Sequence, residues 1–239
     1  LSTNEMYIDG MSSSMPEYVQ YEMYHSVEGL EHAQIVRNAY AIEYDCLEPN
    51  QLKPTLEFKK IKGLFSGGQF NGSSGYEEAA AQGLVAGINA AQEILGKEQI
   101  VIGRDQGYIG VLIDDLVTKE TPEPYRMMTS RAEFRLLLRQ DNADMRLTPI
   151  GYKVGLISEE RYQRLLDKKK MIEDEMARVR KINFGANERV QNFLLKNNST
   201  ELKKGVTFKD LVCRPELNYD LVSSLDDTAP ELPLEVREQ

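Results

Sequence analysis

The fold of this chain is decided by residues 63–91, GLFSGGQFNGSSGYEEAAAQGLVAGINAA. The apolar residues at its start predict a short strand, and the alanine-rich run after Tyr76 predicts a helix. Ser74 and Glu77 have the spacing of a capping box, which marks the start of that helix. The expected order is therefore strand, glycine turn and helix.

The glycine turn is a candidate ligand site. A turn that leads into a helix exposes backbone N–H groups where the helix dipole favours phosphate or another electron-rich group. Glycines let the backbone approach a ligand closely, and the turn holds Gly67, Gly68, Gly72 and Gly75. The pattern is neither GxGxxG nor GxxxxGK[ST]. A turn that only packs its helix against a sheet is an equally good interpretation.

A second candidate is the arginine-rich segment 125–146. Ser130 and Glu133 form another capping box, so that Arg131, Arg135 and Arg139 would share one helical face. Guanidinium groups at that pitch can bind phosphates in a bidentate manner. Two alternatives stay open: an ion network with Glu133, Asp141 and Asp144, and a strand over residues 134–139.

The remaining pattern predicts mostly helices. A capping box at Ser14 and Glu17 starts one that runs to about Ser26, and a long helix is expected from Ser158 to about Lys181. Further helices are expected over 107–118, 190–196, 208–213 and 219–225, a strand over 39–44, a connector over 96–103 and a break over 121–124. The expected architecture is the end of an α/β domain followed by a mostly helical domain.

Composition narrows the class of protein. The chain has 239 residues and a net charge of −9, and its apolar stretches are shorter than the roughly 20 residues of a membrane span. Residues 161–189 nevertheless carry nine basic and five acidic side chains, which gives a possible basic face. Cys46 and Cys213 form neither a CxxC motif nor a zinc pattern, and His25 and His32 have no nucleophile or metal-ligand pattern beside them. We expect a cytoplasmic protein without a metal site.

Several motifs in a fixed order resemble the glucose-inhibited division protein A family. They are GGQFNGSSGYEEAAAQG from Gly67, YAIEYD from Tyr40, LKPTLE from Leu52, YIGVLIDDL from Tyr108, EPYRMMTSRAEFRLLLR from Glu123, DNADMRLT from Asp141, and RPE from Arg214. The resemblance covers most of residues 1–225. It implies a flavoprotein with two dinucleotide folds that installs a carboxymethylaminomethyl group on the wobble uridine of tRNA.

The resemblance also implies cofactors and partners. The family uses FAD, NADH and a folate one-carbon donor, and it works as a homodimer with a tRNA-modification GTPase. The turn residues Gln69, Gly67, Gly68, Asn71, Gly72 and Gly75 would contact FAD, with Gln69 as the direct contact. Arg126 and Arg135 are the first candidates for tRNA contact, followed by Arg131 and Arg139, and by Lys168 and Lys169 of the basic helix. The motifs do not identify the catalytic residues.

The resemblance implies a division into three parts. Residues 1–97 would be the C-terminal part of an FAD-binding domain, residues 98–150 a connecting helical segment with the arginine-rich motif, and residues 151–239 a truncated helical C-terminal domain. The chain begins at Leu1 and contains no GxGxxG, so we expect a piece of a longer enzyme that is inactive alone.

Two functional hypotheses follow. In the first, the chain contributes part of the flavin site and part of the tRNA surface of an FAD-dependent enzyme. In the alternative, it is a non-catalytic tRNA-docking and dimerisation module of that enzyme. An unrelated flavoprotein of the disulfide-reductase type is disfavoured, because the sequence has no CxxxxC motif.

Overall fold

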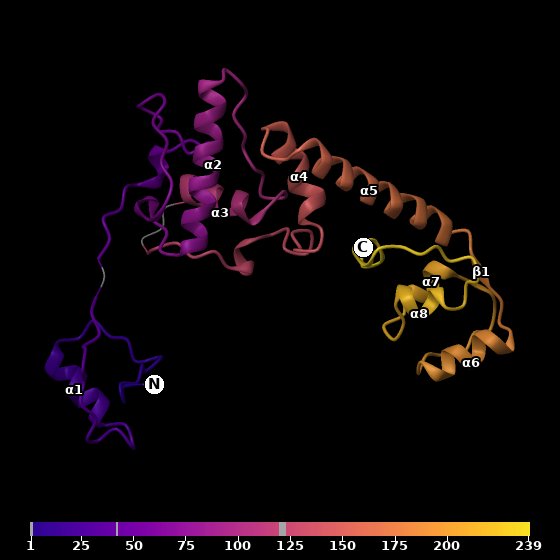
Figure 1. Ribbon diagram of the computed structural model, residues 1–239, viewed down its shortest axis with the longest axis horizontal. Helices are drawn as coiled ribbons and strands as arrows, with labels where there is room; N and C mark the ends of the chain where they lie inside the picture. Colours follow the sequence, from indigo (N-terminus) through magenta and orange to yellow (C-terminus); the bar gives the residue numbers. More distant parts are fainter. Residues whose placement is uncertain (1, 42, 120–122) are drawn as a thin grey trace. The chain divides into compact units, whose positions relative to one another are not determined.

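The computed structural model describes residues 2–41, 43–119 and 123–239 (Figure 1). The chain divides into two compact units, Leu1–Leu47 and Glu48–Gln239. In the described residues it is mostly helical, with one antiparallel two-stranded sheet. The three-part division at residues 97 and 150 stays a prediction.

The first unit contains the helix α1, Glu17–His25. The helix is where the sequence predicts it, but the capping box at Ser14 and Glu17 is wrong, because Pro16 is the N-cap residue and no side chain caps the helix. The buried Gln20 bonds to both the N–H and the carbonyl of Ala39. The predicted strand over 39–44 is wrong for the described residues of that range, none of which lies in a strand. The Ala39 N–H bonds to the side chain of Gln20 instead of to a neighbouring strand.

The second unit begins with a core built around two helices, α2 (Tyr76–Ile94) and α3 (Tyr108–Thr118), whose contact is visible in Figure 1. The short 3₁₀ helix η1, Pro49–Gln51, packs on α3. Leu52, Leu56, Val85, Ile113 and Val117 fill the space between these elements. The predicted strand at 63–67 is only an isolated bridge from Glu57 to Phe65, because the described residues provide no longer strand to pair with it. The predicted connector over 96–103 has no regular structure.

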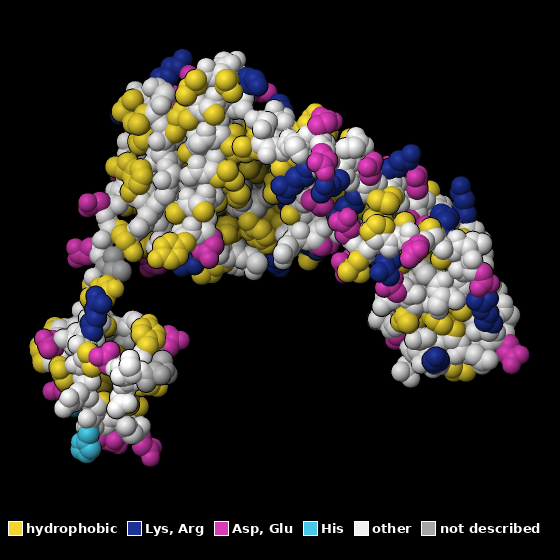
Figure 2. All heavy atoms as spheres, in the orientation of Figure 1, with side chains coloured by type: hydrophobic (Ala, Val, Ile, Leu, Met, Phe, Trp, Pro, Cys, Tyr) yellow, Lys and Arg dark blue, Asp and Glu magenta, His cyan; other side chains and the backbone are white. Residues whose placement is uncertain are grey.

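Helix α2 has an unusual distribution of polarity. Its buried side includes four polar residues, Glu78, Gln82, Asn89 and Gln92. Its exposed residues include Tyr76, Leu84 and Ile94, and Figure 2 shows hydrophobic side chains gathered over this part of the molecule. The buried polar groups bond mainly to turns and connectors. Asn89, for example, donates to the carbonyls of Thr55 and Ile100 and accepts from the Ile100 N–H at 2.7 Å.

The helices α4 (Ala143–Lys153) and α5 (Glu159–Val179) form an antiparallel pair. The long helix is the one expected from Ser158, whose hydroxyl accepts from the Arg161 N–H. Helix α4 was not expected, because it buries no residue completely and contains Pro149. Lys168 of α5 pairs with Asp144 of α4 at 2.8 Å, and the rings of Tyr152 and Tyr162 stack with centroids 4.1 Å apart.

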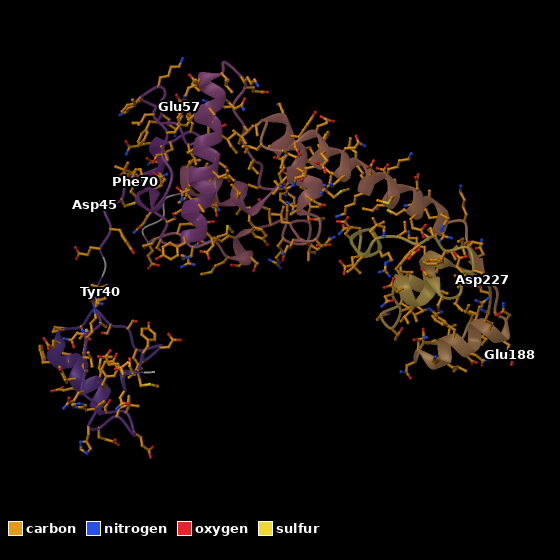
Figure 3. All side chains as sticks on the ribbon, in the orientation of Figure 1. Tyr40, Asp45, Glu57, Phe70, Glu188 and Asp227 are labelled. Atoms are coloured by element: carbon orange, nitrogen blue, oxygen red, sulfur yellow. The ribbon has the colours of Figure 1, made fainter. Side chains whose placement is uncertain are left out.

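The C-terminal part is a small helical body with its own core. The strands β1 (Asn183–Phe184) and β2 (Val206–Thr207) pair. Four short helices complete this part: α6 (Glu188–Lys196), α7 (Phe208–Val212), α8 (Tyr219–Ser223) and α9 (Leu234–Arg237), of which α7 contacts β2 and α9 contacts α5. The predicted helical patches at 190–196, 208–213 and 219–225 are confirmed to within two residues. Arg189 of α6 reaches Asp227, labelled in Figure 3, at 2.9 Å.

Candidate functional site

The glycine turn is held to α2 by a buried chain of hydrogen bonds. Ser66 donates to Asn71, the Asn71 amide donates to Gln82 at 2.9 Å, and Gln82 donates to Ser73 at 2.6 Å. Gln82 also accepts from the Gly68 N–H at 3.3 Å. Three hydrogen bonds to one buried amide restrict its geometry, so Gln82 helps to fix the shape of the turn. The turn includes the short 3₁₀ helix η2, Gln69–Asn71, whose exposed middle residue Phe70 is labelled in Figure 3.

Two glycines of the turn are required by the backbone. A Cβ at Gly67 would lie 2.9 Å from the backbone nitrogen of Gly83, so any larger residue would push the turn away from α2. Gly68 has φ +125°, a conformation that other residues rarely adopt, and a Cβ there would meet open space. The missing side chain at Gly67 therefore lets the turn pack against α2, while the space beside Gly68 is open.

The residues expected to contact FAD do not share one environment. Asn71 is buried and its amide is used within the turn, as described above. Gln69 differs, because its side-chain nitrogen is buried without a hydrogen-bond partner among the described residues. An unsatisfied buried donor is costly unless a ligand accepts from it. Of the turn's side chains, Gln69 is therefore the one that fits a ligand contact.

The arginine-rich segment is not the predicted helix. The short 3₁₀ helix η3, Thr129–Arg131, forms there, irregular turns follow it, and α4 begins only at Ala143. Both the helix and the strand expected over 134–139 are wrong, and the capping box at Ser130 and Glu133 is absent. The reason is tertiary: the Glu133 carboxylate is bound by Arg104, with Nε and Oε1 2.7 Å apart. Arg131, Arg135 and Arg139 therefore do not share a helical face.

A network around Arg104 fastens this segment to α3. Arg104 bonds to Glu133, to the Arg131 carbonyl at 3.1 Å, and to the buried Asp115 at 2.6 Å. Asp115 also accepts from Lys119 and from the Tyr125 hydroxyl, at 2.6 and 2.9 Å. Sequence reasoning did not single out Arg104, which lies about thirty residues from the segment it holds and in no motif.

Electrostatics keep the carboxylates of this network charged. Burial alone would raise the pKa of Asp115, but hydrogen bonds from Lys119, Arg104 and Tyr125 outweigh it and hold that pKa below its ordinary value. The hydrogen bond from Arg104 lowers the pKa of Glu133 to about 2. Burial and the bond to Asp115 raise the pKa of Tyr125, so its hydroxyl stays protonated.

The basic candidates differ in what they already bind. Arg126 pairs with Glu78 at 3.2 Å and Arg139 with Asp141 at 3.0 Å, while Arg131 lies over the ring of Tyr125, 4.4 Å from its centroid. Arg135 is exposed, with no ion pair among the described residues. On α5, Lys168 is buried against Asp144, whereas the exposed Lys169 has only a 3.9 Å contact with Glu173. Of the expected ion network only the pair of Arg139 with Asp141 forms, because Asp144 pairs with Lys168 and Glu133 with Arg104.

The turn and the arginine segment, expected as separate sites, meet at one junction. The Tyr125 N–H donates to the Gly72 carbonyl at 2.7 Å, and Ser73 and Tyr125 form an isolated parallel bridge. Arg126 follows directly and reaches the first turn of α2 through Glu78. A ligand at the glycine turn and a polyanion at Arg126 would therefore be neighbours.

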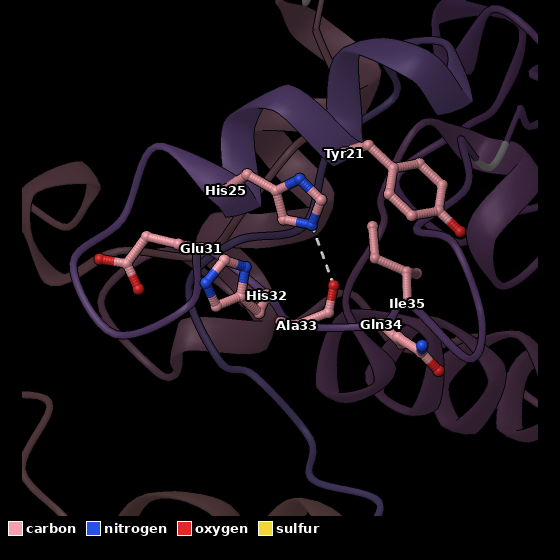
Figure 4. A pocket seen from close by; sticks show the side chains of 7 residues that line it. All are labelled: Tyr21, His25, Glu31, His32, Ala33, Gln34 and Ile35. Carbon is pink, nitrogen blue, oxygen red and sulfur yellow. Dashed lines mark hydrogen bonds between the residues drawn. The ribbon is translucent and has the colours of Figure 1, made fainter.

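The first unit holds an open pocket lined by Tyr21, His25, Glu31, His32, Ala33, Gln34 and Ile35 (Figure 4). His25 Nε2 lies 2.9 Å from the Ala33 carbonyl oxygen, which holds the imidazole against the backbone. Within the described part of the chain, no group of three or more His, Cys, Asp or Glu residues is arranged to hold a metal ion. No helix there is long and apolar enough to cross a membrane.

Comparison with known proteins decides the family. Residues 1–98 match the model of glucose inhibited division protein A, and residues 159–239 match the model of the tRNA modifying enzyme MnmG/GidA C-terminal helical domain. The chain belongs to the MnmG/GidA family. The tRNA uridine 5-carboxymethylaminomethyl modification enzymes MnmG of Lachnoclostridium phytofermentans and Caldicellulosiruptor saccharolyticus are 66% and 61% identical to it, over 98% and 99% of the chain.

A solved structure of Aquifex aeolicus GidA, in its form II crystal, matches this MnmG/GidA chain over its whole length, with a TM-score of 0.81 and 43% identity. The form I crystal gives a TM-score of 0.74 and 45% identity. The chain covers 37% of the form II structure, and it covers 37% and 38% of the two MnmG relatives. It therefore spans little more than a third of the length of the proteins it matches.

Proposed function

We propose that this chain is part of an FAD-dependent enzyme that modifies C5 of the tRNA wobble uridine with a carboxymethylaminomethyl group. The observation that carries the proposal is the 66% identity, over 98% of the chain, to an enzyme named for this modification. The meeting of a glycine turn with an arginine-rich segment supports it, because the reaction needs a flavin and a polyanion side by side. In this proposal the enzyme is a homodimer that works with a GTPase partner and uses NADH and a folate one-carbon donor.

The glycine turn and α2 would be the remnant of a dinucleotide fold and would close one side of the flavin pocket. Gln69 would donate its unpartnered side-chain N–H to the cofactor, and Gly68 and Gly72 would let the backbone come close to it. Gly67 and Gly75 would shape the turn, because their missing side chains make room for α2 and for Glu78. The dipole of α2 would favour negative charge at its N-terminus. FAD, when bound, supplies the redox chemistry, and the chain's residues bind and orient it. Asn71 would act indirectly, by holding the turn.

The arginine segment would bind tRNA. Arg126 and Arg135 have exposed guanidinium groups, and Arg131 is held over an aromatic ring with its carbonyl fixed by Arg104. Arg139, Lys169 and the other exposed basic residues of α5 would add phosphate contacts. Lys168 is better explained as the side chain that joins α4 and α5, because it is buried and paired with Asp144.

One set of variants separates this function from the alternative of a non-catalytic docking module. In the full-length enzyme that contains this chain, Gln69→Ala should lower flavin occupancy and turnover while tRNA affinity stays the same. Arg126→Ala and Arg135→Ala should each weaken tRNA binding by about 10-fold, as expected for a lost charge-assisted contact. Gln51→Ala and Arg37→Ala, both at exposed positions, are the matched controls. If Gln69→Ala leaves occupancy and rate unchanged while the arginine variants abolish tRNA binding, the docking module is the better description.

A further inference from the structure

The side chain of Glu78 bridges the first turn of α2 and the arginine segment. It is buried, with 4% of its surface exposed. Its Oε1 accepts two hydrogen bonds, from the Met127 N–H at 2.8 Å and from Arg126 Nε at 3.2 Å. A single carboxylate oxygen therefore fixes both the backbone after Arg126 and the guanidinium group itself.

The absence of a side chain at Gly75 makes room for this bridge. A Cβ at Gly75 would lie 1.7 Å from Glu78 Oε2 and 3.1 Å from Arg126 Nε. Gly75 is the buried N-cap residue of α2, so it is also the last residue of the glycine turn. The turn, the glutamate and the arginine therefore occupy one shared space.

The charges of this pair are maintained while one side of the arginine stays open. Burial would raise the pKa of Glu78, but the bonds from Met127 and Arg126 outweigh it and hold the pKa below its ordinary value. The Arg126 side chain is 55% exposed, and the only hydrogen bond it donates among the described residues is through Nε. Its terminal N–H groups are free to bind a phosphate or a base.

We propose that Glu78 is a positioning residue of the proposed tRNA-modifying reaction. It holds Arg126 in one orientation at the edge of the glycine turn, so that the nucleotide bound by Arg126 is presented to the flavin. This inference rests on the proposed function and adds a specific residue to it. Glu78 contributes alignment and does not itself attract the nucleic acid, because its charge repels phosphate.

Because the charge of Glu78 is negative, an experiment can distinguish the positioning of Arg126 from the attraction of tRNA. In the full-length enzyme, Glu78→Gln keeps the size of the side chain and removes a negative charge next to Arg126. We expect turnover at saturating tRNA to fall at least 10-fold, because a neutral amide oxygen holds the Arg126 guanidinium more weakly than the carboxylate does. Affinity for the tRNA substrate should stay the same or increase slightly, since one repulsive charge is gone. Flavin occupancy, read from absorbance, should match that of the unmodified enzyme.

Three further variants complete the design. Glu77→Gln removes the same charge from the same helical turn at an exposed position, and it should leave turnover unchanged. Arg126→Lys changes an exposed side chain and so keeps the proposal testable if Glu78→Gln fails to fold. It should lose turnover like Glu78→Gln and keep most of the tRNA affinity, because lysine retains the charge but not the Nε–H geometry. Combined with Arg126→Ala, Glu78→Gln should cause no further loss of turnover.

The result that would overturn the inference is specific. Glu78→Gln behaving like Glu77→Gln, or losses that multiply in the double variant with Arg126→Ala, would show that Glu78 does not act through Arg126. Full turnover of the Arg126→Lys variant would overturn it as well. A failure of the proposed function looks different, because the unmodified full-length enzyme would then fail to retain FAD or to modify tRNA.

Discussion

Asp115 shows how much one residue can organise in this molecule. It is fully buried on α3 and accepts hydrogen bonds from Arg104, Lys119 and the hydroxyl of Tyr125. Removing one partner of a buried charge pair is costly, because the other charge loses its compensation. The same residue holds Tyr125, whose ring carries Arg131. The placement of the arginine segment thus depends on a carboxylate that no ligand would touch.

Changing this carboxylate should alter both stability and its pH dependence. We expect Asp115→Asn to lower the free energy of unfolding by about 2–4 kcal/mol at pH 7. Because the folded pKa of Asp115 is depressed, its contribution is present above the unfolded pKa near 4 and is lost as pH falls through the lower folded value. Glu133, with its pKa lowered to about 2, adds to the same acid loss.

Urea unfolding of the chain between pH 2 and pH 7 measures this effect. The unmodified protein should lose stability steadily below pH 4, and Asp115→Asn should show a flatter profile. Asp114→Asn is the matched control, because it contacts the same arginine from a side chain that is 43% exposed. Equal effects of the two substitutions would contradict a special role for the buried carboxylate.

At the scale of elements, the sequence predicted the long helices but not the side-chain hydrogen bonds and ion pairs that join them to the rest of the chain. Helices α2, α3 and α5 carry strong periodic patterns and were found, while α4 buries no residue completely and was missed. None of the three expected capping boxes forms, and only at Glu133 does a distant residue, Arg104, bind the expected capping side chain. Glu78 and Gln82 could have been noticed, because they recur with Val85 and Asn89 at core-facing spacing. Arg104 left no such signal.

The close approach between the turn and α2 predicts opposite effects for two glycines. We expect Gly67→Ala to destabilise the protein by about 1–3 kcal/mol, because its Cβ would press on the backbone of Gly83. Gly87→Ala lies on the exposed side of the same helix with nothing within 4 Å, so it should stabilise by about 0.5–1 kcal/mol. Thermal unfolding followed by circular dichroism measures both. A stabilised Gly67→Ala variant would mean that the turn can move away from the helix freely.

Helix α5 allows a test of which lysines face a polyanion. If exposed lysines bind phosphates, Lys169→Gln should reduce the slope of log affinity for tRNA against log salt by about 0.7–0.9. Lys168→Gln should leave the slope nearly unchanged and should lower stability, because it breaks the buried pair with Asp144. Titration of the full-length enzyme with tRNA at several salt concentrations measures the slope. Equal slopes for the unmodified enzyme and Lys169→Gln would exclude Lys169 from the interface.

At the scale of the whole molecule, the hydrophobic clusters that stabilise the second unit contain no residue of the first unit. The main clusters involve only residues after position 51, around Leu56, around Val111 and around Phe208. The boundary after Leu47 falls between the family motifs at residues 40–45 and 52–57, and the predicted division at residues 97 and 150 stays a prediction. The boundary after Leu47 rests on contacts within the structure, whereas the predicted boundaries at residues 97 and 150 rest on the family motifs.

We therefore expect residues 48–239 to fold without residues 1–47. A shortened chain should unfold in urea with the same midpoint as the full chain, within the error of the measurement, because its apolar clusters are intact. Circular dichroism at 222 nm reports the transition. A clearly lower midpoint for the shortened chain would mean that the first unit contributes stability to the second.

The polar inner side of α2 has a mechanical consequence. Hydrogen bonds are directional, and Glu78, Gln82, Asn89 and Gln92 each need particular backbone atoms within reach. A displacement along the helix axis by a single residue, about 1.5 Å, would separate these partners together. The helix therefore has a single position along its axis in which all four side chains keep their hydrogen bonds. A group that binds at the amino end of α2 therefore meets a helix whose axial position is fixed by hydrogen bonds along its buried side.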